Sequence, residues 1–212
     1  INKFKLYDKI DYKKNIMDCK GCASKINLTT LQSSLPKDII KSSEDATQIT
    51  KGSSYVNSID MITSIVTDPF LLGKISANHA LSDIYASLAK PLSALMILQL
   101  PKSSQSIHSN DLKQIQEGAK LVLNENSCML SGGHTMIGQD ENPVIGFSIV
   151  GKKLKKTNKK IKNNDVVILT EKLGTGIIFA GVNSNTISSK YVKDVSKQLE
   201  NGNIKLGKIL NQ

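Results

Sequence analysis

The sequence contains no arginine and no tryptophan. All 28 basic residues are lysines, and aromatic residues make up only 4% of the chain. Arginine forks and stacked aromatic rings are the groups that read nucleic-acid bases, whereas lysine supplies a compact point charge. The formal net charge of +10 is therefore a weak argument for nucleic-acid binding, which we keep as the least favoured function.

The positive charge is concentrated in the C-terminal part of the chain. Residues 1–151 contain 15 lysines and 14 acidic residues, whereas residues 152–212 contain 13 lysines and 4 acidic residues. Seven of these lysines lie in the segment KKLKKTNKKIK. Because such a run is usually a solvated segment, we predict a lysine-rich linker over residues 152–164. It would separate a domain at 26–151 from the start of a second, truncated domain at 165–212.

Long apolar runs are absent as well. No segment reaches the roughly 18 apolar residues of a membrane helix, and the N-terminus, which begins at Ile1, lacks the apolar stretch of a signal peptide. We therefore expect a cytoplasmic protein. The missing initial methionine suggests a piece of a longer polypeptide.

Cysteine is scarce, with only Cys19, Cys22 and Cys128. An odd, small number excludes a disulfide scaffold and suits a reducing compartment. Cys19 and Cys22 form a C-x-x-C, but no second ligand pair completes a zinc site, and no convincing strand precedes it as a thioredoxin-like motif requires. A redox or nucleophilic role stays open, within a flexible N-terminal loop that we predict over residues 1–25.

Hydrophobic periodicity and turn residues predict a mixed α/β (α+β) chain. Asp68 and Pro69 are typical of a helix start, and Lys51-Gly52 is typical of a hairpin turn. The predicted helices lie within 26–35, 67–89, 110–126 and 188–200. The predicted strands lie on either side of the hairpin turn within 46–63 and within 91–101, 127–135 (running into a glycine turn), 143–151 and 165–181 (followed by a glycine turn and a helix start).

Acidic residues suggest a cation site. If the hairpin packs on the following helix, Asp45, Asp60 and Asp83 could converge on a divalent cation that carries a triphosphate. The alternative is that they are solvated caps. His79 and Asp83, one helical turn apart, could be metal ligands or a histidine with a carboxylate partner.

The segment SGGHT offers a second candidate site. Its glycines could let backbone N–H groups approach a phosphate as an anion-binding nest, or could simply form a tight turn. His134 could contact the phosphate or could be structural.

The succession GCASKI, EDA, SIDMITSIVTDPFLLGKISANHALSDIYA, AKPLSALMIL, SGGHT and VIGFSIVG resembles the selenophosphate synthetases (selenide, water dikinases). The resemblance runs from about Asp18 to Gly176. It implies the fold of the aminoimidazole ribonucleotide synthetase-like superfamily, with an N-terminal α/β domain built on a mixed sheet and a second α/β domain that this chain only begins. Family members dimerise through the N-terminal domain.

The resemblance also implies roles for individual residues. The nucleophile corresponds to Cys22 and the essential lysine to Lys25, which also meets the nucleotide. The metal ligands correspond to Asp45 and Asp83, with Asp83 near the nucleotide too. Further ATP contacts correspond to Ser42, Ser43, Glu44, Asp60, Gly133, His134 and Thr135.

The implied reaction uses ATP, selenide, water and Mg²⁺, and gives selenophosphate, AMP and phosphate. A nearby lysine would favour the thiolate of Cys22, and a mobile lysine can neutralise charge that shifts during phosphoryl transfer. The alternative is a non-catalytic nucleotide-binding or dimerisation module of the same fold.

The chain departs from the family pattern at several positions. Ser24 replaces a second loop cysteine, Glu44 replaces an aspartate, and His79 stands where the family has asparagine. SLAKP replaces MGGKP, which removes two glycines close to the expected nucleotide. The family's third metal aspartate belongs to the second domain, beyond this chain.

Overall fold

A computed structural model of the protein describes residues 26, 28–36, 45–154, 162–184 and 186–210. Its centre is a five-stranded sheet in the order β1-β2-β5-β3-β4. The pair β3 and β4 is parallel, and the other neighbouring strands are antiparallel. The strands are β1 (Thr47–Gln48), β2 (Tyr55–Thr63), β3 (Ala89–Leu100), β4 (Met129–Ile137) and β5 (Val144–Lys153). The predicted mixed α/β fold is confirmed.

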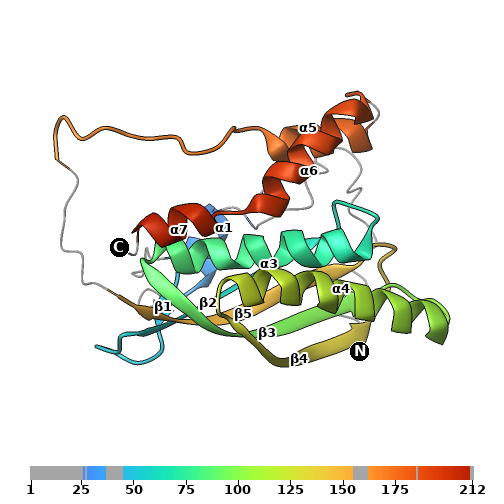
Figure 1. Ribbon diagram of the computed structural model, residues 1–212, viewed down its shortest axis with the longest axis horizontal. Helices are drawn as coiled ribbons and strands as arrows, with labels where there is room; N and C mark the ends of the chain where they lie inside the picture. Colours follow the sequence, from blue (N-terminus) through green and yellow to red (C-terminus); the bar gives the residue numbers. More distant parts are fainter. Residues whose placement is uncertain (1–25, 27, 37–44, 155–161, 185, 211–212) are drawn as a thin grey trace.

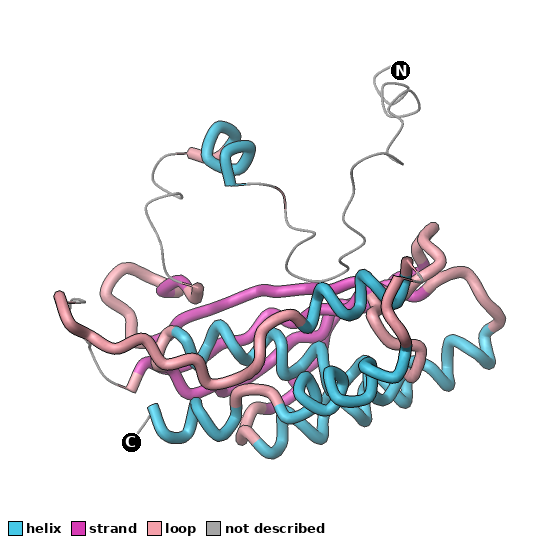
Figure 2. Tube along the Cα trace, turned by 90° about the horizontal axis from the view of Figure 1, so that it is seen from above, coloured by secondary structure: helices cyan, strands magenta, loops and turns pink. Residues whose placement is uncertain are grey.

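Two long helices cover one face of this sheet, as Figures 1 and 2 show. Helix α3 (Pro69–Ala86) begins as predicted, because the carboxylate of Asp68 accepts a hydrogen bond from Leu71 N–H at 3.0 Å and Pro69 occupies the first turn. Helix α4 (Gln105–Glu125) begins five residues before the predicted start, because Ser104 caps it by accepting from Ile107 N–H.

The hydrophobic core lies between the sheet and these two helices. Its largest fully buried side chains include Phe147 and Ile149 from β5 and Leu72 and Leu81 from α3. Helices α3 and α4 approach closely through glycines, since a Cβ on Gly73 or Gly118 would collide with backbone atoms of the other helix. These contacts hold α3 in a fixed position against β2 and β5.

The short helix α1 (Leu28–Ser34) precedes the sheet, as predicted. The C-terminal helices are α5 (Thr175–Asn183), the 3-10 turn η4 (Ser189–Tyr191), α6 (Val192–Asn201) and α7 (Ile204–Leu210). The predicted helix within 188–200 is thus confirmed. No helix in the described part of the chain has the length and apolar character needed to cross a membrane.

Helices α6 and α7 pack on the side of α3 that faces away from the sheet (Figure 1). Lys74 forms an ion pair with Glu200 at 2.9 Å. The side-chain amide of Asn78 donates to the carbonyls of Glu200 and Leu199, at 2.6 and 3.2 Å. Helix α3 is consequently buried on two sides, which the sequence pattern did not reveal.

Two predicted elements were wrong. The glycine turn in SGGHT does not form, because these residues continue β4 along β3 to Ile137. The strand expected at the start of 165–181 is absent, and Val167 is 96% exposed. An apolar run becomes a strand only beside another strand, and none lies next to this segment among the described residues. The helix start expected there is confirmed by α5, which follows Gly174 at φ +101°.

Candidate functional site

Five of the predicted site residues lie outside the described residues. They are Cys22, Lys25, Ser42, Ser43 and Glu44. Their roles therefore stay predictions. The remaining predicted residues, which lie on or beside β1, β2, α3 and β4, can be placed.

The predicted hairpin packs against α3 and brings two pairs of polar side chains together. Ser58 Oγ donates to Asp83 Oδ2 at 2.8 Å, and His79 Nε2 lies 2.9 Å from Asp60 Oδ2. The match follows from element geometry. Residues two apart on a strand are separated by about 6.7 Å, and residues four apart on a helix by about 6 Å along the axis. Both pairs can therefore form between one face of β2 and one face of α3.

Asp60 is held at both carboxylate oxygens. Oδ1 accepts from the N–H of Met61 at 3.0 Å, while Oδ2 faces His79. The residue is only 8% exposed, whereas the His79 side chain is 26% exposed. A carboxylate with so little access to water needs such partners. His79 and Asp83 do share a helix face, and a carboxylate partner of His79 is Asp60 on the neighbouring strand.

Asp45 lies near the end of α3 that carries Asp83. The N–H of its neighbour Ala46 donates to Ser87 Oγ at 3.1 Å, and the N–H of Ser87 donates to the carbonyl of Asp83 at 3.0 Å. Asp45 itself is exposed. Asp45 and Asp83 therefore belong to one end of the β2–α3 contact, with Asp60 one helical turn away.

A magnesium ion at Asp45 and Asp83 stays a prediction. Among the residues that the structure describes, no group of three or more His, Cys, Asp or Glu side chains could hold a metal. Mg²⁺ does not need such a cage, because it keeps several waters and takes one or two carboxylates together with substrate phosphates. Asp45 and Asp83 carry carboxylate oxygens, the type of ligand that this ion prefers.

The glycine-rich segment forms a different surface from the one predicted. An irregularity in the pairing sets Ala94 opposite Leu130 and Leu95 opposite Gly132, which leaves Ser131 as an extra residue. Gly132 and Gly133 have φ of +146° and +157°, and a Cβ on Gly133 would collide with the backbone of Met96. Glycine is required at position 133 for the close approach of the two strands, and the tight turn or nest is not formed.

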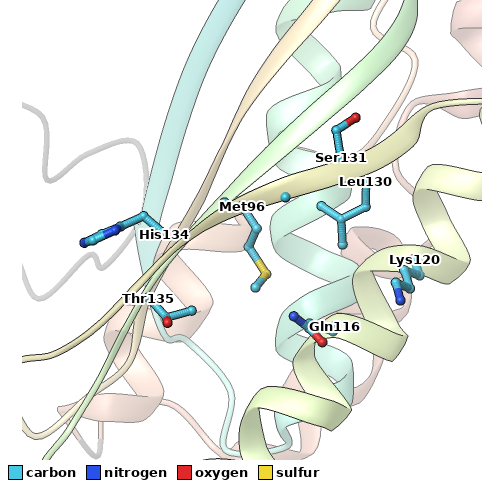
Figure 3. A pocket seen from close by; sticks show the side chains of 9 residues that line it. Met96, Gln116, Lys120, Leu130, Ser131, His134 and Thr135 are labelled. Carbon is cyan, nitrogen blue, oxygen red and sulfur yellow. The ribbon is translucent and has the colours of Figure 1, made fainter.

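A hollow of about 370 Å³ lies between this part of β4 and helix α4. Its lining includes Met96, Gly133, Thr135, Gln116 and Lys120. In Figure 3 the His134 side chain points away from α4, whereas Gln116 and Lys120 border the hollow from the helix side. The sequence analysis did not predict these two residues. They could have been found from the topology, because a helix that connects the parallel strands β3 and β4 must pass beside β4.

Cys128 stands apart from these surfaces. It is buried, and burial raises the pKa of its thiol to about 11. Burial, and secondarily Cys128, also raise the pKa of Tyr85, whose hydroxyl bonds to Asn126 Oδ1. A buried thiol with a raised pKa is a poor nucleophile. Among the three cysteines, the structure therefore removes Cys128 as a candidate.

A family model matches the part of the chain that forms the sheet. Residues 43–152 match the AIR synthase related proteins in their N-terminal domain. This range holds β1 to β4, α3, α4 and all of β5 except Lys153.

Individual proteins are also similar to this chain. A selenide, water dikinase of Myxococcus xanthus is 30% identical over 201 residues, which cover 88% of this chain and 56% of that protein. One from Caldanaerobacter subterraneus is 34% identical over 142 residues, covering 65% and 39%. A crystal structure of thiamine monophosphate kinase from Aquifex aeolicus is 20% identical, with a TM-score of 0.48, covering 60% of this chain and 44% of that one. The chain spans about half the length of the curated relatives that it matches.

Proposed function

The chain belongs to the AIR synthase related family, and we propose that it is the N-terminal part of a selenide, water dikinase, acting on ATP and selenide. One observation carries the proposal. Asp60 on β2 and Asp83 on α3, which the resemblance assigns to ATP and to magnesium, lie in the same β2–α3 contact about one helical turn apart, each already oriented by a hydrogen-bonding partner. Such pre-orientation suits the binding of a polyphosphate, whose charges need fixed partners.

Different residues in the described part of the chain would bind different parts of the magnesium–nucleotide complex. Asp45 and Asp83 would hold Mg²⁺, which neutralises phosphate charge during transfer. Asp60 would meet the nucleotide from the adjoining strand. Thr135, at the rim of the hollow on β4, would offer a hydroxyl.

The N-terminal loop would supply the remaining groups. Lys25 would place a mobile positive charge beside the phosphates, and a thiolate at Cys22 would hold selenium, because sulfur and selenium are both soft. Closure of the loop would exclude water until selenide is in place.

A homodimer is part of the proposal. The sheet face opposite α3 and α4 carries exposed apolar side chains from three strands, among them Ile59 (61% exposed), Met61, Leu95 and Met136. Soluble monomers rarely leave a large apolar patch open to water. A second copy of this domain would cover the patch, as the family resemblance implies.

The binding test uses the chain as it is. Titration calorimetry with ATP in the presence of Mg²⁺ should give saturable binding. Asp83→Asn should weaken this binding by at least about tenfold, because the proposed metal ligand loses its negative charge. A wild-type chain that binds no ATP would contradict the proposal.

The reaction itself is tested in the longest natural polypeptide that contains this sequence. We expect selenide-dependent formation of AMP, abolished by Cys22→Ser and by Lys25→Ala. Full activity in both variants would remove the loop from the mechanism. ATP binding without any selenide-dependent AMP would favour the alternative, a non-catalytic nucleotide-binding or dimerisation module.

A further inference from the structure

Asp60 depends on hydrogen bonds for its orientation. The torsion that turns the plane of an aspartate carboxylate is soft, so rotamer preference alone does not fix that plane. In this protein the N–H of the next residue, Met61, holds Oδ1 at 3.0 Å, and His79 Nε2 holds Oδ2 at 2.9 Å. The first contact is local to the strand. The second crosses from β2 to α3 and fixes the carboxylate relative to the helix that carries Asp83.

We propose that His79 is a positioning residue for the nucleotide site: a proton on its Nε2 holds Asp60 in the plane in which that carboxylate meets the nucleotide. This inference rests on the proposed function for the identity of the ligand. Nothing in the family resemblance or the comparisons assigns a role to His79. In this arrangement Nε2 donates the hydrogen bond, whether the ring is neutral or charged, because a carboxylate only accepts.

The alternative is that His79 merely fills space beside the core. Against this, its side chain is partly exposed, at 26%, and lies in the same row as Asp83 on α3 and Ser87, which follows the last residue of α3. All three take part in hydrogen bonds or ion pairs with β2 or with the residues before β1. A residue that only packed would not need a nitrogen at this position.

The length of the side chain provides the test. The donor is Nε2, the ring nitrogen far from the backbone, and the amide of glutamine reaches a similar distance. His79→Gln should therefore keep the hydrogen bond, while His79→Ala should lose it. In calorimetric titrations of the full chain with ATP and Mg²⁺, we expect His79→Gln to stay within about threefold of wild type. His79→Ala should bind about tenfold more weakly.

The matched control is Lys74→Gln on the same helix. It breaks an ion pair of the same length, 2.9 Å, but on the face of α3 that contacts α6. It should leave ATP affinity unchanged. Equal ATP affinity of wild type and His79→Ala would overturn the inference, as would an equal loss in the Ala and Gln variants.

A second measurement does not need the nucleotide. The side-chain carboxyl ¹³C resonance of Asp60 reports the hydrogen bonding of that carboxylate. We expect it to shift in His79→Ala and to stay near its wild-type position in His79→Gln and Lys74→Gln. An unshifted resonance in His79→Ala would overturn the positioning role. A wild-type chain that binds no ATP would instead refute the proposed function alone, because the resonance would still show whether His79 orients Asp60.

Discussion

At the scale of single residues, the buried thiol of Cys128 makes stability depend on alkaline pH. Burial raises its folded-state pKa from 9.0 to about 11. Between these values the unfolded chain has released this proton and the folded chain still binds it, so the free energy of unfolding falls as pH rises. The slope for one group reaches about 1.4 kcal/mol per pH unit. We expect urea midpoints to fall from pH 8.5 to pH 10.5.

The control for this prediction is Cys128→Ala, which removes the thiol and leaves the lysines unchanged. Its stability should be lower at neutral pH, because a buried sulfur is lost, but should fall less steeply between the two pH values. Parallel pH profiles for the variant and the wild type would contradict a raised pKa. At pH 8 the folded wild type should also leave Cys128 unmodified by thiol reagents.

The sequence predicted several polar residues of the site, but not which of them pair with one another. Period-two alternation in β2 and the helical spacing of His79 and Asp83 predicted one polar face each. His79 and Asp60 lie on different elements. Whether they pair depends on the position of β2 along the axis of α3. Packing of the whole core sets that position, so no local pattern could give it. The bond from Ser58 to Asp83 was missed for the same reason.

At the scale of elements, the junction between α3 and β3 holds a strained residue. Leu88 has φ +51°, in the left-handed region that favours glycine. It belongs to SLAKP, where the resembling family has glycines. A comparison of Leu88→Gly with Leu88→Ala measures the free-energy cost of the positive φ, because both variants lose the Leu side chain. We expect the Gly variant to be about 1 kcal/mol more stable in urea unfolding.

The exposed helix position Ser109 provides the reference for that comparison. In α4, Ser109→Gly should be less stable than Ser109→Ala by about 1 kcal/mol, the usual order in a helix. At position 88 the Gly variant should instead be more stable than the Ala variant. If the Ala variant is the more stable one at both positions, position 88 does not need a positive φ.

Helices and turns with complete local signals were predicted correctly. The prediction failed where a neighbouring strand determines the structure of a segment. The cap at Asp68 and the turn at Gly52 are local, and both formed where expected. Two glycines in SGGHT predicted a turn, but β3 runs alongside through Leu100 and offers hydrogen bonds that an extended chain can use. Residues 166–169 had every sign of a strand except a partner. Strand formation therefore could not be read from composition alone.

At the scale of the whole molecule, α3 joins two halves of the chain. It carries Asp83 toward β2, and on its other side Asn78 and Lys74 bind α6. The sequence predicted α3 and a helix near residues 188–200 but gave no sign that they meet. Polar residues in the middle of an apolar helix were the available clue, since a buried amide such as Asn78 requires partners.

The open face of the sheet leads to the last prediction, on assembly. If a second copy covers this face, sedimentation of the wild-type chain should give a dimer. A lysine placed in the patch should then give a monomer, because its charge would be buried without a partner. Leu95→Lys, at a side chain 48% exposed on β3, is the variant of choice.

Two other exposed apolar sites provide controls for assembly. Ile107→Lys on α4 changes an equally exposed residue on the covered side of the sheet, and Val167→Lys changes the unpaired apolar segment. Both variants should remain dimers. A dimer that persists in Leu95→Lys but dissociates in Val167→Lys would assign association to residues 166–169. A monomeric wild type would contradict dimerisation through the sheet.

Since Asp60 and Asp83 lie on the opposite side of β2 from this patch, Leu95→Lys separates assembly from metal binding. Any loss of ATP affinity in that monomer would then measure what the second copy contributes to the site.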